Sequence, residues 1–230
     1  MPYFYFDQYY WLLVIPAMLI AAWAQFKVKS TFRKYSSLHN TRGLTAATVA
    51  RQILDRNGLT HVSIERVSGE LTDHFDPRTN VVRLSDSIIN STSVAAIGVA
   101  AHEVGHAVQY ANKYAPIKIR ATLIPITNIG STLAFPLAIF GIFAGLEWLT
   151  SLGILLFVAV VLFQLVTLPV EFNASARALK TLDEDSLLDR DELGGAKRVL
   201  TAAALTYVAA LIVALANLIR LILLSRRNNN

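Results

Sequence analysis

The chain has 230 residues, a net charge of +5 and no cysteine, and only 16% of its residues are charged. Its mean hydropathy of +0.46 is too high for an ordinary soluble domain, and the absence of cysteine excludes disulfides and thiolate metal ligands. Nucleic-acid binding is not expected, because the basic residues lie beside apolar segments and no basic groove with interleaved aromatic residues accompanies them.

The first predicted element is an apolar segment at Tyr9–Phe26, within an N-terminal region 1–26. About 20 apolar residues in a helix cross a bilayer. No basic residue precedes this segment and no small-residue cleavage site follows it, so we expect a membrane anchor rather than a signal peptide. Four basic residues follow between 27 and 34, and the positive-inside rule therefore places the chain from residue 27 onward in the cytoplasm.

Residues 27–121 are expected to form a small α+β part. Thr45 is the predicted N-cap of a helix that ends near Asn57, where Gly58 stops it. The apolar residues then change from a period of about four to a period of two, which favours strands. The predicted strand and hairpin comprise Val62, Ile64 and Val67, then Leu71–Phe75 and Val81–Leu84 around a turn at Asp76–Asn80.

A helix is predicted from about Ser91, capped by Ser91 or Thr92, and it carries the sequence His-Glu-Val-Gly-His at positions 102–106. Residues four apart lie on one face of a helix, so His102 and His106 can bind one metal ion. Glu103 follows the first histidine, where its carboxylate can accept a proton from a water molecule at the metal. This pattern predicts a zinc site with a general base beside it.

Two further apolar segments form a predicted membrane hairpin in residues 122–170, and residues 200–230 supply a last span and a tail. Pro125 and Pro136 predict a kink in the second span. The last span leaves Arg226 and Arg227 outside, against the positive-inside rule. With the N-terminal anchor, these segments predict a mainly α-helical integral membrane protein with about four transmembrane helices; the three later spans are Thr122–Leu146, Leu149–Val170 and Leu200–Leu224.

Two histidines leave a catalytic zinc ion one protein ligand short. A metzincin would continue the motif with Gly and His where this chain has Gln109 and Asn112, so that arrangement is excluded. The third ligand has to lie on the same side of the membrane, after an even number of crossings. Glu171 meets this condition, because it directly follows the two-span hairpin and is the first acid after more than twenty uncharged residues.

The motifs resemble two related groups of membrane peptidases. The order of Glu171, an aromatic residue and Ala174 is similar to the HtpX-type Glu-zincins, whose motif reads Glu-aromatic-x-Ala-Asp. Leu71–Thr79, Pro169–Ser175 and the order of segments over nearly the whole chain resemble the bacterial YugP-like neutral zinc metallopeptidase family more closely. Ser175 stands where the HtpX-type motif has Asp, so the hydrogen bond that would orient a ligand histidine is expected to be weaker.

The resemblance implies a membrane-embedded gluzincin that holds one Zn²⁺ per chain on His102, His106 and Glu171. It also implies a multi-pass protein of the bacterial inner membrane, with a zincin-like, cytosol-facing active site. The Glu ligand would begin a helix in region 171–199, which continues into an acidic loop. The expected partners are a peptide or membrane-protein substrate, the lipid bilayer and possible membrane-protein partners, with membrane-protein turnover as one role.

The expected chemistry is peptide-bond hydrolysis, in which zinc lowers the pKa of its water to about 7 and Glu103 acts as general base. A donor is also needed for the developing oxyanion. The resemblance favours His74, because Leu71–Phe75 would be the strand that aligns an extended substrate. The residues alone do not rank the four candidates, which are His74, Tyr110, Asn173 and Arg177.

Two alternatives remain open from the residues. A site-two-type intramembrane protease would need an Asp-Gly motif for its third ligand, and the chain has no Asp-Gly. A non-catalytic zinc-binding membrane scaffold or adaptor would not need the glutamate at position 103, which is present.

Overall fold

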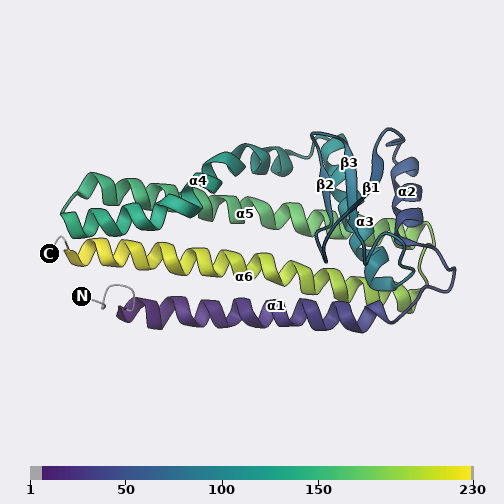
Figure 1. Cartoon of the computed structure of the whole chain (residues 1–230), viewed down its shortest axis with the longest axis horizontal. Helices are drawn as coiled ribbons and strands as arrows, with labels where there is room; N and C mark the ends of the chain where they lie inside the picture. The colour runs from purple at the N-terminus through teal and green to yellow at the C-terminus, as the bar shows by residue number, and fades with distance from the viewer. Residues whose placement is uncertain (1–6, 229–230) are drawn as a thin grey trace. The chain divides into compact units, whose positions relative to one another are not determined.

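A computed structural model describes residues 7–228, so the first six residues of the predicted anchor and the last two of the predicted tail lie outside the described residues. The protein is mainly helical with one small sheet, as predicted (Figure 1). In chain order the elements are the π-helical turn Tyr10–Val14, α1 (Ile15–Ser36), α2 (Ala46–Arg56), β1 (Ser63–Val67), β2 (His74–Asp76), β3 (Val81–Ser85), α3 (Val94–Ala111), α4 (Ala115–Ala144), α5 (Glu147–Glu184) and α6 (Arg190–Asn228).

The chain divides into two compact units, each built from separate stretches of sequence. Unit 1 contains the described residues 7–25, 118–168 and 205–228, and unit 2 contains residues 26–117 and 169–204. Helices α1, α4, α5 and α6 therefore supply residues to both units, although only the first three residues of α4 belong to unit 2. The five-part division expected from the sequence stays a prediction.

Unit 1 consists of long apolar helices. Among residues 7–228, four helices are long and apolar enough to cross a membrane, as predicted, and they are Tyr10–Ser36, Ala115–Ala144, Glu147–Glu184 and Arg190–Arg227. Each continues beyond its predicted span. Pro125 and Pro136 both lie inside α4, and its ribbon changes direction along its length in Figure 1. Large apolar side chains remain exposed on these helices, for example Trp11, Trp23, Phe140 and Leu155.

Helices α4 and α5 form the predicted hairpin, and glycines allow their close packing. A β-carbon on Gly141 would lie 2.5 Å from the backbone nitrogen of Thr150, and one on Gly153 would lie 2.5 Å from that of Ala138. Gly145, between the helices, has a φ of +67°, which an L side chain rarely adopts. Side chains at Gly141 and Gly153 would push the two helices apart, whereas one at Gly145 would strain the turn between them.

Unit 1 also contains a buried ion pair. Asp7 and Arg220 are 7% and 2% exposed, and the Nε and Nη2 atoms of Arg220 lie 2.9 and 2.8 Å from Oδ2 of Asp7. The guanidinium also stacks over the rings of Tyr10 and Phe135, at 4.9 and 5.2 Å from their centres. This pair joins the start of the first apolar helix to the last turns of α6.

Unit 2 contains the sheet, in the order β1-β3-β2. β1 pairs in parallel with β3, and β2 pairs with β3 as the predicted hairpin, with Phe75 opposite Val82. Asp76 accepts hydrogen bonds from Arg83, the backbone of Arg78 and Thr79, which together hold the pKa of its carboxyl well below its usual range. The side chain of Asp76, the first residue of the turn between β2 and β3, therefore stabilises that turn.

The second predicted strand is shorter than Leu71–Phe75. It begins at His74, because Leu71 has a φ of +54°, which no strand residue adopts. Asp73, between them, accepts a 2.7 Å hydrogen bond from the backbone nitrogen of Ser85 at the end of β3. The segment before β2 is thus fixed by a side chain instead of by strand pairing.

The helix caps of unit 2 confirm one prediction and correct another. Thr45 caps α2 by accepting from the backbone of Thr48. The predicted cap of α3 at Ser91 or Thr92 is wrong, because Ser93 accepts from the backbone of Ala96 and the helix begins at Val94. Ser91 instead accepts a hydrogen bond from the backbone nitrogen of Ser93, which places the cap two residues later.

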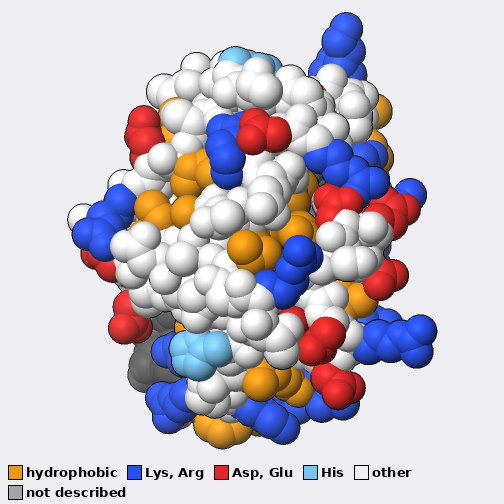
Figure 2. Space-filling view, turned by 90° about the vertical axis from the view of Figure 1, so that its right-hand side faces the viewer, with side chains coloured by type: hydrophobic (Ala, Val, Ile, Leu, Met, Phe, Trp, Pro, Cys, Tyr) orange, Lys and Arg blue, Asp and Glu red, His pale blue; other side chains and the backbone are white. Residues whose placement is uncertain are grey.

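The core of unit 2 packs α2, the sheet and α3 against the unit 2 parts of α5 and α6. Ile53, Leu84, Ile97, Val104 and Leu182 are among its buried residues. The outer surface of the unit differs from unit 1: side chains of both charges, with small apolar areas between them, cover the face that carries α2 (Figure 2). This face of unit 2 thus exposes charged side chains to solvent (Figure 2).

Candidate metal centre

The residues of the predicted zinc site come from two helices of unit 2. Helix α3 carries His102, Glu103 and His106, and the part of α5 that follows Pro169 carries Glu171. The helices approach closely at Gly105, where a β-carbon would lie 2.7 Å from the carbonyl oxygen of Ala174. The glycine inside the motif therefore permits the backbone contact that brings both sets of side chains together.

The structure brings His102, His106 and Glu171 into one cluster, whose metal-binding atoms all lie within 4.8 Å of one another. Oε2 of Glu171 lies 3.1 Å from Nε2 of His102 and 3.5 Å from Nε2 of His106. The two imidazole rings are edge to face, with 4.7 Å between their centres. The side chains are only 13%, 12% and 3% exposed, so the cluster is almost closed to solvent.

The outer nitrogen of each histidine has its own hydrogen-bonding partner. Nδ1 of His102 lies 3.1 Å from Oγ of Ser175, and Nδ1 of His106 lies 3.0 Å from Oε1 of Gln109. With a metal ion bound, an oxygen acceptor at Nδ1 would hold the proton there and leave the lone pair on Nε2 for the ion. Both Nε2 atoms face Glu171, which is the arrangement that a shared cation requires.

Gln109 is fully buried, and its orientation is determined by α5. Its Nε2 donates to the carbonyl of Val170 at 2.8 Å and to Oδ1 of Asn173 at 3.0 Å. The amide nitrogen is thus committed to two acceptors, and the amide oxygen is directed to His106. Sequence reasoning used Gln109 only to exclude a metzincin and did not find this role.

The candidate oxyanion contacts Asn173 and Arg177 lie beside this network. Oδ1 of Asn173 accepts from Gln109 and also from Nε of Arg177, at 2.8 Å. Arg177, Asn173, Gln109 and His106 therefore form one chain of hydrogen bonds. The contact of Asn173 or Arg177 with a substrate stays a prediction.

The other two candidates belong to the side of α3 next to the sheet. His74 is exposed on β2, and its Nδ1 bonds to the carbonyl of Thr72 at 2.8 Å. The ring of Tyr110 packs against that of Phe75, with 5.6 Å between their centres. His74 is not part of the metal-binding cluster. β2 pairs only with β3 in this sheet, so it is an edge strand and its other edge can take an added chain.

Glu103 is the acidic side chain nearest in sequence to the ligands. Burial raises the pKa of its carboxyl above its ordinary value, and positive charge on His102 and His106 acts in the opposite direction. A divalent cation in the cluster would act in the same sense as those histidines and favour the carboxylate. Glu103 is thus held between a burial that favours its protonated form and neighbouring positive charge that favours its carboxylate.

The donor set fits a zinc ion. Two imidazole nitrogens and one carboxylate oxygen are the protein ligands of one class of catalytic zinc site, which leaves a fourth position for water. Hydrogen bonds from the outer nitrogens to neighbouring side chains are the usual support of such ligands. The residues present in unit 2 meet both requirements.

The sequence matches a family model described as "Putative neutral zinc metallopeptidase" over residues 10–226. A relative in Bacillus subtilis (strain 168), described as "Putative membrane protease YugP", is 48% identical over 220 residues, which is 95% of this chain and 98% of the relative. No solved structure matches the chain. The matches cover both units and all of the residues that form the cluster.

Proposed function

The chain belongs to the family described as "Putative neutral zinc metallopeptidase". From this premise we propose that it is a membrane-bound zinc peptidase of the gluzincin class. His102, His106 and Glu171 would hold one zinc ion, and Glu103 would be the general base. The observation that carries this proposal is the convergence of the three donors from two helices to within 4.8 Å, with both outer imidazole nitrogens already engaged.

When bound, zinc supplies a Lewis acid that lowers the pKa of a water molecule to about 7. Glu103 accepts a proton from the attacking water and later gives it to the leaving amine nitrogen. Ser175 and Gln109 hold the two imidazoles in the tautomer that binds metal. Burial of the cluster excludes bulk water, which strengthens each of these interactions.

The substrate class follows from the edge strand and the apolar helices. An extended peptide can add to the free edge of β2 through main-chain hydrogen bonds, with His74 as the candidate contact to the substrate. The four apolar helices would keep the enzyme in the bacterial inner membrane, near membrane-protein substrates and their turnover. The basic residues that follow the first span support a cytoplasmic active site.

Metal analysis of the purified chain tests the ligand set. Wild type is expected to hold about one zinc per chain, and Glu171→Gln is expected to hold much less because a carboxylate ligand is lost. Glu103→Gln is the matched control, since it makes the same chemical change beside the cluster without removing a ligand, and it should keep its zinc. Equal zinc in wild type and Glu171→Gln would overturn the assignment of Glu171.

Hydrolysis of unfolded or membrane-protein substrates tests the base. Glu103→Gln is expected to reduce turnover by about 10²–10⁴-fold, the usual contribution of a general acid–base group. Equal turnover by the wild type and this variant would favour a non-catalytic scaffold.

Reporters fused near residue 110 test the topology, and a signal from outside the cell would contradict a cytoplasmic site.

A further inference from the structure

A polar pocket lies in unit 1 at the turn between α4 and α5, separate from the metal cluster. Its volume is about 240 Å³, and residues of three apolar helices line it. Gly141, Ile142 and Gly145 belong to the end of α4 and the turn after it, and Ser225 belongs to the last turns of α6; Glu147, Thr150 and Ser151 belong to the start of α5.

Glycines form the wall of this pocket on the α4 side. Gly141 permits contact with Thr150, as described above, and this contact holds the start of α5 against the end of α4. A β-carbon on Gly145 would meet no atom within 4 Å, so the space beside the turn is open. The hydroxyl of Thr150 donates to the carbonyl of Leu146, and its oxygen remains able to accept a hydrogen bond.

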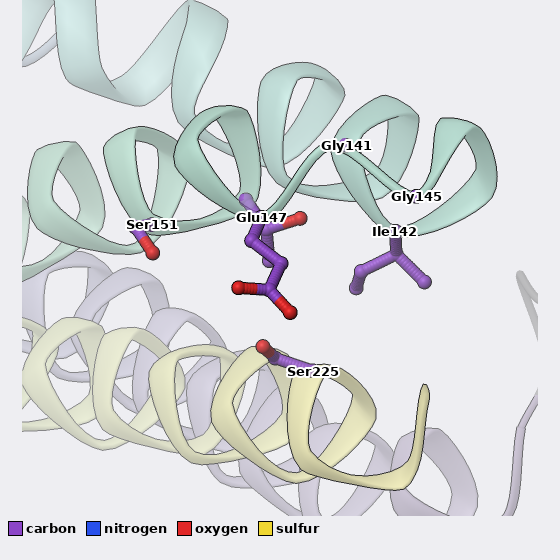
Figure 3. A pocket seen from close by; sticks show the side chains of 7 residues that line it. Gly141, Ile142, Gly145, Glu147, Ser151 and Ser225 are labelled. Carbon is purple, nitrogen blue, oxygen red and sulfur yellow. The ribbon is translucent and has the colours of Figure 1, made fainter. Parts of the chain in front are cut away.

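The pocket is negatively charged. Glu147 is the single charged residue between positions 121 and 170. Its side chain extends from α5 into the space before α6, with its carboxylate toward Ser225, and the hydroxyl of Ser151 faces the same space (Figure 3). The C-terminal end of α4 and the N-terminal end of α5 both border the pocket, and because their partial charges are opposite, the negative charge of the pocket comes from Glu147. The carboxylate and the two serine hydroxyls can accept hydrogen bonds from a cationic donor.

The residues around this pocket are of the kinds that contact lipid headgroups. Phe143 and Trp148 flank the turn and are 55% and 66% exposed, and a tryptophan beside a charged residue at the end of an apolar helix is typical of the membrane interface. Arg226 and Arg227 directly follow Ser225 and are exposed in the last turn of α6. A carboxylate and two guanidinium groups thus occur at the same end of this unit's helices.

We propose that this pocket binds the headgroup of a phospholipid that carries a primary ammonium, of the phosphatidylethanolamine type. The ammonium group enters the pocket and donates hydrogen bonds to the Glu147 carboxylate and to the hydroxyls of Ser151 and Ser225. The phosphate pairs with Arg226, which directly follows Ser225 on α6, and the acyl chains run along the exposed apolar faces of α4 and α5. A quaternary ammonium has no N–H to donate, so phosphatidylcholine binds more weakly.

Lipid binding to the full-length chain in detergent micelles, measured by native mass spectrometry, tests this proposal. Phosphatidylethanolamine and phosphatidylcholine with identical acyl chains are the probes, since they differ only in the methyl groups on nitrogen. Wild type is expected to bind phosphatidylethanolamine about tenfold more tightly or more, as hydrogen bonds to a charged group suggest. Equal affinity for the two lipids, or a preference for phosphatidylglycerol, would overturn the proposal.

Variants test whether the preference for phosphatidylethanolamine arises at this pocket. Glu147→Gln is expected to abolish the preference, and Ser225→Ala to reduce it, while Glu70→Gln, an exposed acid of unit 2, should leave it unchanged. A preference that persists in Glu147→Gln would place the lipid elsewhere and contradict the proposal. If Glu147→Gln does not fold, the wild-type comparison and Ser225→Ala still decide between these outcomes. Zinc content measured on each sample should not change, which separates this site from the metal cluster.

Discussion

Asp7 in unit 1 and Glu171 in unit 2 are both buried carboxylates that face nitrogen groups, but their partners differ. Asp7 faces a guanidinium, which is permanently charged, so that pair is neutral as it stands. Glu171 faces two imidazoles whose outer nitrogens are held by uncharged acceptors. The first arrangement joins two helices, whereas the second offers three donors to a cation.

The largest expected effect comes from breaking the buried ion pair of Asp7 and Arg220. Asp7→Ala leaves a buried guanidinium without its carboxylate, and we expect it to lower the free energy of unfolding by about 3–5 kcal/mol. Thermal unfolding in detergent measures this loss. The double variant Asp7→Leu, Arg220→Met removes both charges and should be much more stable than Asp7→Ala. A single variant as stable as the wild type would show that the pair contributes little.

A second prediction concerns the metal-binding cluster. Gln109→Leu removes the acceptor of the His106 Nδ1 proton, and we expect zinc affinity to fall by about 10–100-fold, as for other partners of metal-binding histidines. Competition with a chelating dye measures the affinity. Gln109→Glu keeps an acceptor for His106 but replaces the amide nitrogen that donates to Val170 and Asn173 with an oxygen, so it should lose zinc affinity as well. Unchanged zinc affinity in Gln109→Leu would mean that α3 alone orients His106.

The smallest effect is expected at Ser175. Ser175→Ala removes one neutral hydrogen bond to His102, which is worth about 0.5–1.5 kcal/mol, or roughly a 2- to 12-fold weaker zinc affinity. Ser175→Asp introduces the carboxylate of the HtpX-type motif and should bind zinc more tightly than wild type. The same dye competition compares the three proteins. If Ser175→Asp binds zinc more weakly than Ser175→Ala, the serine does not contact His102 as described.

Local patterns were sufficient to predict much of this molecule. The spacing of His102 and His106 placed them on one helix face, and the apolar segments predicted all four long helices. Glu171 was singled out because the predicted membrane hairpin would return the chain to the side from which it started, and the structure places this residue beside the two histidines. Each of these inferences depends on short-range periodicity or on counting crossings.

The features that sequence reasoning missed depend on distant contacts. Gln109 bonds to residues 61 and 64 positions away, and Asp7 pairs with a residue 213 positions away. No local pattern distinguishes such a glutamine from an ordinary polar residue on a helix. The start of α3 was misplaced for a related reason, because Ser91 and Ser93 are both good caps and only their mutual hydrogen bonds decide between them.

The glutamine at position 109 also determines the charge of the proposed site. An amide neither gains nor loses a proton at physiological pH, so Gln109 adds no charge of its own to the site. Zinc carries two positive charges, and the carboxylates of Glu171 and Glu103 carry two negative ones. A carboxylate at position 109 would leave the buried site with a net negative charge. With neutral Gln109 and Ser175 the ion and its surroundings balance, and no further counterion has to be buried with them.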